Sequence, residues 1–284
     1  MKNILIPSDF SVESAVAFNY AVQIAHLTEA KLTLLHAYHV PVFGSVENSG
    51  SSLASLLDVT ADIASTAFTE AIKKAHSPEI LESLKFEYVH TPKFNVQSII
   101  ELHETHVFDL IIIENKPQNK LYDLLFGNYI DKLIDHIKNT PLMVVPPTVP
   151  FCPIQHIVYS TAMLAPFETL VSLCNFVRFF GAKVSFLHII EEDTRSYPQK
   201  AAAFKDRAAQ AFTTQTFDFI EIKNPDIEDT LLDFLHNHIP RPDLLLMIER
   251  PKRTFDRLFI NSMTKNMTQY APLPIVIFHE PSSV

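Results

Sequence analysis

The sequence contains very little glycine. Only four of its 284 residues are glycines, and they stand at Gly44, Gly50, Gly127 and Gly181. Loops that cradle phosphate groups usually need glycine, because close approach of the backbone and positive φ angles are difficult for other residues. The composition therefore disfavours a glycine-rich nucleotide-binding loop.

Cysteine is also scarce. Cys152 and Cys174 are the only two cysteines, and they do not form a CxxC pair. This usage fits a reducing compartment and argues against both a disulfide framework and a cysteine-rich metal site. Neither cysteine is a candidate for chemistry.

Long basic runs and long apolar runs are both missing. The formal net charge is −9. We therefore expect no basic surface for nucleic acid, and we expect an anionic membrane to repel the protein surface on average. The first apolar stretch ends at Pro7, too early for a signal-peptide core, and no run approaches the roughly 18 residues of a membrane-spanning helix. We therefore expect a cytoplasmic protein whose partners are small molecules or other proteins, with no nucleic acid and no membrane among them.

Apolar residues, in contrast, are plentiful, and they recur in an internal repeat. Hydrophobic residues make up 47% of the chain and charged residues 19%, which is enough apolar surface for a folded core. The segment "AKLTLLHAY" at 30–38 matches "AKVSFLHII" at 182–190, and "FDLIIIENKP" at 108–117 matches "PDLLLMIERP" at 242–251. The same order of segments in both halves predicts two copies of one domain.

A proline-rich stretch separates the two copies. The segment "PPTVPFCP" at 146–153 contains four prolines, and such stretches form stiff, extended linkers. We predict a first domain over 1–147, a linker over 148–153 and a second domain over 154–284.

Short apolar runs alternate with amphipathic stretches in each half, and strands that are covered on both faces show this pattern. In the first half the predicted strands are 3–7, 31–38, 84–90, 109–114 and 141–146. The predicted helices are 12–28, 53–76, 95–106 and 125–138. Alternation of this kind gives an open parallel sheet with right-handed crossovers. The fold class that we predict is α/β, with two tandem doubly wound, Rossmann-like domains.

Asp9 stands just past the end of the first predicted strand, in "ILIPSDFS". Doubly wound sheets bind ligands outside the carboxyl ends of their strands, where a carboxylate can accept from a ribose hydroxyl or an exocyclic amine. Alternatively, Asp9 or Ser11 caps the helix that follows. The sequence leaves both interpretations open.

Several segments together resemble the universal stress protein family, as a tandem two-domain member. These are "NILIPSDFS", "KLTLLHAY" and the closing run "FDLIIIENKP…LFGN…NTPLMVVP", with looser counterparts in the second half. The resemblance implies the fold of the adenine nucleotide alpha hydrolase-like superfamily. It also implies that the two domains pair through their last strands as an intramolecular pseudo-dimer, with a further homodimer as one option.

In nucleotide-binding members of the family, three glycines after the fourth strand hold the phosphates. By position the last of these glycines is Gly127, followed by Asn128 instead of Ser or Thr, while the other two are replaced by Pro117 and Glu114. Proline lacks an amide hydrogen and glutamate brings a carboxyl group, so both replacements oppose phosphate binding. The second half has Ile248, Pro251 and Asn261 at these three positions.

Other positions still match the adenosine contacts that the family implies: Pro7, Ser8, Asp9 and Ala37. In the second half Ala162 replaces Asp9, which predicts a degenerate copy. The first-domain cleft, Pro7, Ser8, Asp9, Ala37, Gly127 and Asn128, is therefore the candidate site, with ATP or AMP as its possible cofactor.

Histidine and basic clusters give no stronger candidate. The pairs in "HETH" at 103–106 and "HNH" at 236–238 lack the spacing of metal ligands and fit helix ends. His36 and His188 recur at one position of the repeat, and a buried, hydrogen-bonded role or a ligand contact would explain this. The basic segment 250–257 would attract an anion or simply form a solvated loop.

The sequence predicts no catalytic residue and no metal ligand. We therefore expect a non-catalytic stress-response protein that binds a ligand or partner. The alternative is an ATP- or AMP-binding protein with weak ATPase or nucleotide-switch activity in its first domain.

Overall fold

The computed structural model describes residues 1–12, 14–37, 53, 66–91, 96–115, 129–191, 197–249 and 260–280. The chain divides into two compact units, Met1–Phe151 and Cys152–Val284. The division falls within the proline-rich stretch that the sequence predicts as a linker. Each unit is an α/β structure with five parallel strands among its described residues.

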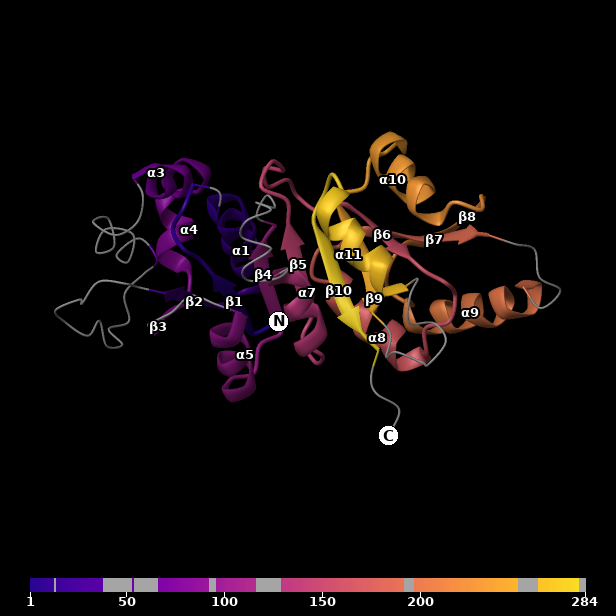
Figure 1. The fold of residues 1–284 in the computed structure, drawn as a ribbon, viewed down its shortest axis with the longest axis horizontal. Coiled ribbons are helices and arrows are strands. Elements are labelled where there is room, and N and C mark those ends of the chain that lie inside the picture. Colours follow the sequence, from indigo (N-terminus) through magenta and orange to yellow (C-terminus); the bar gives the residue numbers. More distant parts are fainter. Residues whose placement is uncertain are drawn as a thin grey trace. The chain divides into compact units, whose positions relative to one another are not determined.

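The first unit alternates strands and helices along the chain (Figure 1). Its strands are β1 (Asn3–Pro7), β2 (Lys31–Ala37), β3 (Phe86–Thr91), β4 (Leu110–Glu114) and β5 (Leu142–Val145). Its helices are α1 (Ser14–Thr28), α3 (Thr66–Ala75), α4 (Pro78–Ser83), α5 (Val96–Thr105) and α7 (Tyr129–His136). The strands lie in the order β3-β2-β1-β4-β5. Because the order reverses between β1 and β4, the ligand crevice expected of this fold lies at their carboxyl ends.

The second unit repeats this arrangement. Its strands are β6 (His156–Ser160), β7 (Lys183–Ile190), β8 (Phe217–Lys223), β9 (Leu244–Glu249) and β10 (Ile275–His279). Its helices are α8 (Phe167–Val177), α9 (Tyr197–Ala211), α10 (Ile227–Asn237) and α11 (Ile260–Tyr270). The order β10-β9-β6-β7-β8 places β6 and β9 where the first unit has β1 and β4.

The core of the first unit forms because its central strands are apolar on both faces. Ile4, Leu5 and Ile6 of β1 are at most 1% exposed, as expected for a parallel sheet covered by helices. Helix α1 packs against α3 and α4, whereas α5 packs against α7. Right-handed crossovers place these two groups of helices on opposite faces of the sheet.

The predicted strands of the first half are confirmed, with ends that shift by one or two residues. The predicted helix 53–76 is confirmed at its end, because α3 ends at Ala75, but the sequence did not predict the separate helix α4 that begins at Pro78. Ser77 precedes α4 in an extended conformation, and a proline at the first position of a helix starts that helix readily. Residues 54–65 lie outside the described part of the chain.

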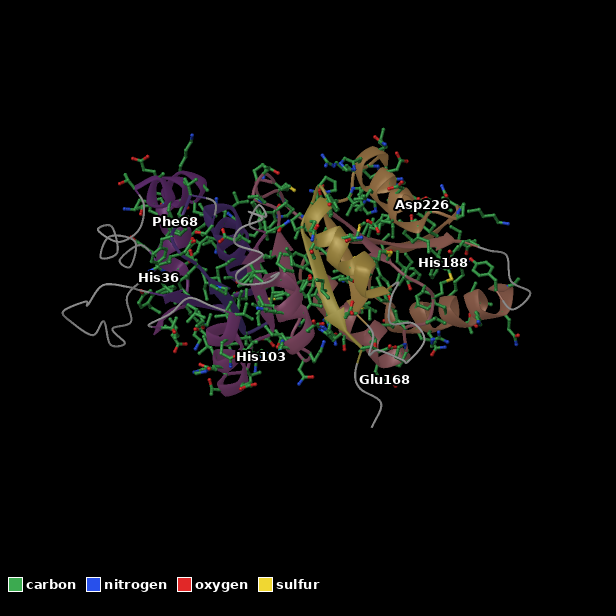
Figure 2. The ribbon with its side chains drawn as sticks, in the orientation of Figure 1. His36, Phe68, His103, Glu168, His188 and Asp226 are labelled. Carbon is green, nitrogen blue, oxygen red and sulfur yellow. The ribbon has the colours of Figure 1, made fainter. Side chains whose placement is uncertain are left out.

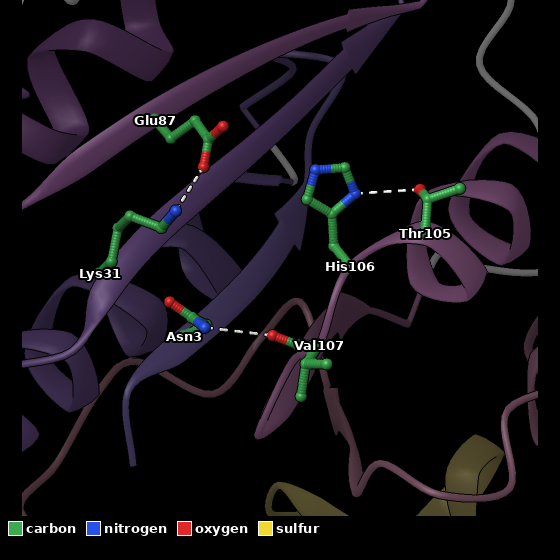
Figure 3. A network of polar contacts seen from close by, with 6 residues as sticks. All are labelled: Asn3, Lys31, Glu87, Thr105, His106 and Val107. Atoms are coloured by element: carbon green, nitrogen blue, oxygen red, sulfur yellow. Dashed lines mark hydrogen bonds and ion pairs between the residues drawn. The ribbon is translucent and has the colours of Figure 1, made fainter.

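The amino ends of the strands in the first unit are joined by polar contacts (Figure 3). Lys31 on β2 pairs with Glu87 on β3 at 2.6 Å. The Asn3 side-chain amide donates to the Val107 carbonyl at 3.1 Å. This edge lies opposite the expected ligand crevice, so these contacts fix the sheet without occupying the site.

An aspartate ahead of β4 holds the start of β1. Asp109 Oδ2 accepts the backbone N–H groups of Lys2 at 2.6 Å and Asn3 at 2.9 Å. In the second unit Asp243 Oδ2 accepts two equivalent bonds at the start of β6, each of 2.9 Å. The recurrence of this aspartate in the sequence repeat therefore has a structural cause.

No helix in the described part of the chain is both long and apolar enough to cross a membrane. The cytoplasmic location stays a prediction, as does the pairing of the two halves through their last strands.

Candidate functional site

Ser8 holds the turn that follows β1. Ser8 is 1% exposed, and its backbone N–H donates to the Leu35 carbonyl on β2 at 2.9 Å. Its hydroxyl oxygen accepts the Phe10 N–H at 3.1 Å and lies 3.0 Å from Ser14 Oγ. Because the Ser14 hydroxyl donates to the Ser11 carbonyl at 2.9 Å, the Ser8 hydroxyl is the donor to Ser14. Ser8 therefore uses its backbone and side chain to shape the turn.

Asp9 lies on this turn with an exposed side chain. Its Oδ1 accepts the Ser11 N–H at 3.0 Å, and Ser11 Oγ accepts the Ser14 N–H at 3.3 Å. Of the two capping interpretations, the structure shows that Ser11 caps α1, whereas Asp9 forms an Asx turn ahead of the helix. A contact between Asp9 and a ligand stays a prediction.

Phe10 completes the turn in an unusual conformation. Its φ is 57°, and a bulky residue adopts a positive φ only when its surroundings over-determine it. Phe10 is 1% exposed and stacks on His36, with ring centroids 4.2 Å apart. Phe68 of α3 also packs on Phe10, with ring centroids 5.2 Å apart. Aromatic packing beneath the turn therefore fixes the backbone that presents Asp9.

His36 anchors the same turn from β2. The ring is 4% exposed, and its Nδ1 lies 2.7 Å from the Ser8 carbonyl oxygen. Since a carbonyl oxygen only accepts, Nδ1 carries the proton. The structure thus confirms a buried, hydrogen-bonded histidine, and Figure 2 labels it in the first unit together with Phe68.

The remaining predicted site residues divide into two groups. Pro7 ends β1 and Ala37 ends β2, so both lie at the carboxyl edge together with Ser8 and Asp9. Glu114 ends the neighbouring strand β4 and is 7% exposed. The predicted loop residues lie outside the described part of the chain: Pro117, Gly127 and Asn128.

The turn after β6 in the second unit has the same framework. Thr161 Oγ1 accepts the Met163 N–H at 2.9 Å, and Met163 has a φ of 59°. His188 Nδ1 lies 2.7 Å from the Thr161 carbonyl oxygen. A hydroxyl, a left-handed backbone and an imidazole thus recur at equivalent positions.

The surface of this second turn differs from the first. Ala162 stands where the first unit has Asp9, and the next exposed side chains are apolar, with Leu164 52% and Phe167 38% exposed. Helix α8 begins after Pro166 without a side-chain cap. The second turn therefore offers neither a carboxylate nor the serine network of the first.

The histidines of the segments "HETH" and "HNH" lie at helix ends. His103 is in the last turn of α5, where its Nε2 lies 3.0 Å from Thr140 Oγ1 and burial lowers its pKa. His238 follows α10 and stacks on Phe234 at 4.2 Å. Within the described residues, no group of three or more His, Cys, Asp or Glu side chains is placed to hold a metal ion. The basic segment 250–257 lies outside the described part of the chain.

Comparison with known proteins decides the family. The model of the universal stress protein family matches residues 1–146, more than half of the 284 residues. The chain belongs to the universal stress protein family. The match covers the first unit of this universal stress protein, the unit that carries Asp9.

Solved structures share the fold over nearly the whole length of this universal stress protein. One from Archaeoglobus fulgidus DSM 4304, also a universal stress protein, matches with a TM-score of 0.63 and 13% identity, covering 98% of each chain. A protein of Pseudomonas aeruginosa UCBPP-PA14 described as a universal stress protein reaches 0.59 and 13% identity, over 98% of this chain and 93% of that one.

A third structure with the fold is the cytoplasmic domain of a prokaryotic cation chloride cotransporter, with a TM-score of 0.56, 13% identity and coverage of 99% and 97%. No curated protein matches the chain. At such identities the likeness shows the fold alone, and the same fold serves proteins with different tasks.

The sequence did not reveal the roles of Phe10 and Ser14 in this universal stress protein. A phenylalanine gives no sign of a positive φ, because glycine and asparagine are the residues that usually adopt it. The one sign in the sequence was position, because Phe10 directly follows Asp9 and its counterpart Met163 directly follows Ala162.

Proposed function

We propose that the protein acts by binding a small ligand at the turn after β1, without catalysing a reaction. The observation that carries the proposal is the exposed carboxylate of Asp9 on a turn held on both sides, by Ser8 and by Phe10. A fixed acceptor at the strand-order reversal suits a ligand that presents hydroxyl or amine donors. A nucleoside such as adenosine has both.

A triphosphate fits this site less well. Glu114 ends β4 with a buried carboxyl side chain, 7% exposed, at the start of the segment in which the family holds phosphates. Three residues later Pro117 supplies no amide hydrogen. We therefore propose that binding depends on the nucleoside part of a ligand and gains little from its phosphates.

The absence of catalysis is supported by how the polar groups of the turn are used. The Ser8 hydroxyl donates to Ser14. The Nδ1–H of His36 donates to the backbone carbonyl of Ser8 and not to its hydroxyl. A nucleophile activated by a base needs a direct hydrogen bond between the two side chains. These described residues make no such pair.

Calorimetric titration with adenosine, AMP and ATP tests the proposal. We expect adenosine to bind, with AMP and ATP no more than about 10-fold tighter, a difference of about 1.4 kcal/mol. Asp9→Ala should abolish binding. Asp9→Asn keeps an oxygen for the Ser11 N–H but loses the charge, so it should weaken binding while leaving the free energy of unfolding unchanged.

Two outcomes would overturn the proposal. Unchanged adenosine affinity in both Asp9 variants would mean that this carboxylate serves only the turn. ATP binding far tighter than adenosine, or ATP hydrolysis that Asp9→Ala abolishes, would instead support the nucleotide switch or weak ATPase. Ala162→Ser in the second unit is the control, since it changes the equivalent turn without adding a carboxylate.

A further inference from the structure

A buried histidine links α3 to α1 in the first unit. His76 follows α3 directly and is 5% exposed. Its Nε2 lies 2.9 Å from Asn19 Oδ1, and its Nδ1 lies 2.9 Å from Gln23 Nε2. An amide oxygen accepts and an amide nitrogen donates, so these contacts require a neutral ring with its proton on Nε2. Both partners belong to α1, so one imidazole pins the end of α3 to that helix.

Helix α3 also supports the turn that presents Asp9. Phe68 of α3 is fully buried, and its ring lies 5.2 Å from that of Phe10 and 5.3 Å from that of Phe18 on α1. Phe10 in turn stacks on His36, which holds the Ser8 carbonyl. Any outward movement of α3 therefore removes packing from the residue that follows Asp9.

The second unit closes its corresponding helix with an apolar residue. Phe212 follows α9 directly, and its backbone N–H bonds to the carbonyl four residues earlier, as that of His76 does. Phe212 is 2% exposed and lies 5.1 Å from the ring of Phe186. A phenylalanine side chain does not titrate, so the second unit serves as an internal control for His76.

We propose that His76 is a proton-sensitive latch, whose protonation releases α3 from α1 and loosens the turn from Ser8 to Phe10. A protonated ring carries a hydrogen on Nδ1 as well, so the Gln23 amide would have to rotate until its oxygen faces that nitrogen. The ring would also place a positive charge in a buried position. Only the description of this turn as a ligand site rests on the proposed function.

Titratable residues lie near His76 in the sequence or on the helices beside it, α1, α3 and α4. Burial, and to a smaller extent His26 on α1, lower the pKa of His76 to about 4. Lys73 and Lys74 lie in the last turn of α3, and Glu79 lies in the first turn of α4. Opening exposes the ring to water, where its pKa returns to an ordinary value near 6.5, so acid favours the open form.

Hydrogen exchange of the α3 amides at pH 7 and pH 5, corrected for the intrinsic rates, tests the latch without any ligand. The two pKa values predict that the opening equilibrium rises by about 20-fold between these pH values. The amides of Phe10 and Ser11 should follow α3, whereas those of α9 should not. Because no ligand is used, the result is independent of whether Asp9 binds one.

Two variants make the test specific. His76→Phe copies the residue of the second unit and should abolish the pH dependence of exchange in α3. Gln23→Glu offers a carboxylate to the protonated ring, so α3 should become more protected on acidification, the reverse of the wild type. Unchanged protection of wild-type α3 between pH 7 and pH 5, or the wild-type response in Gln23→Glu, would overturn the proposal.

Discussion

Single side chains that satisfy several backbone groups set the geometry of both units. Asp109 and Asp243 each accept two backbone N–H groups at the start of a strand through one oxygen. A hydrogen bond to a charged group contributes more than a neutral one, and its loss leaves backbone donors unpaired. These aspartates recur in the repeat because the parallel strands need them, so their recurrence carries no argument for ligand binding.

Replacing Asp109 should therefore cost stability. We expect Asp109→Ala to lower the free energy of unfolding by about 1–2 kcal/mol, because two donors lose their charged acceptor at an exposed position. Asp109→Asn keeps an amide oxygen and should cost less. Urea unfolding monitored by circular dichroism measures both, with Asp206→Ala on the exposed surface of α9 as the control. Equal stability of Asp109→Ala and wild type would contradict this role.

Secondary-structure elements are held together differently in the two units. In the second unit Phe186 of β7 is fully buried and contacts a ring on α9, a ring just after α9 and two rings on β8. The ring centroids lie 5.8 Å from Phe204, 5.1 Å from Phe212, 5.7 Å from Phe217 and 5.0 Å from Phe219. Leu34 occupies the equivalent place in the first unit, since it pairs with Ile6 as Phe186 pairs with Tyr159.

Exchanging these two residues tests how much each element depends on its packing. Phe186→Ala should cost about 3–5 kcal/mol in the free energy of unfolding, because it leaves a large cavity. Phe186→Leu, the residue of the first unit, should cost about 1 kcal/mol, and Leu34→Phe about 1–3 kcal/mol through overpacking. Thermal and urea unfolding give these values, and a cost of Phe186→Leu equal to that of Phe186→Ala would refute the volume argument.

The sequence predicted the strands better than the site. Apolar runs such as residues 110–113 mark buried strands clearly, because both faces of these strands are covered. Helix α4 was missed because six residues are too few to show a helical period, although Ser77 and Pro78 do signal its start. The turn itself could not be foreseen, since the positive φ of Phe10 depends on Ser8, His36 and Phe68, which are distant in sequence or give no local sign.

At the scale of the whole molecule, neutral histidines that are fully or partly buried make stability depend on pH. Burial lowers the pKa of His76 to about 4, and burial also lowers the pKa values of His103 and His156. His156 Nε2 lies 2.8 Å from Ser185 Oγ, and its Nδ1 lies 3.2 Å from the Pro240 carbonyl oxygen. Each of these rings is bound more favourably in its neutral form.

The sign of the pH effect follows from the lowered pKa values. The stabilisation is fully present above the unfolded pKa near 6.5 and is lost as the pH falls toward the lowered folded pKa values. Urea unfolding at pH 7.5, 6.0 and 5.0 should show this fall. His156→Asn, which introduces the residue found at the equivalent Asn3, should make the fall smaller. A free energy of unfolding that stays constant from pH 7.5 to 5.0 would rule out this contribution.

The paired turns after β1 and β6 also have a consequence for engineering. The second turn already holds the hydroxyl of Thr161, the left-handed backbone of Met163 and the imidazole contact of His188. Copying the surface of the first turn onto the second would therefore begin at the exposed position Ala162. The turn of the second unit can therefore be redesigned without changing any residue of the first unit.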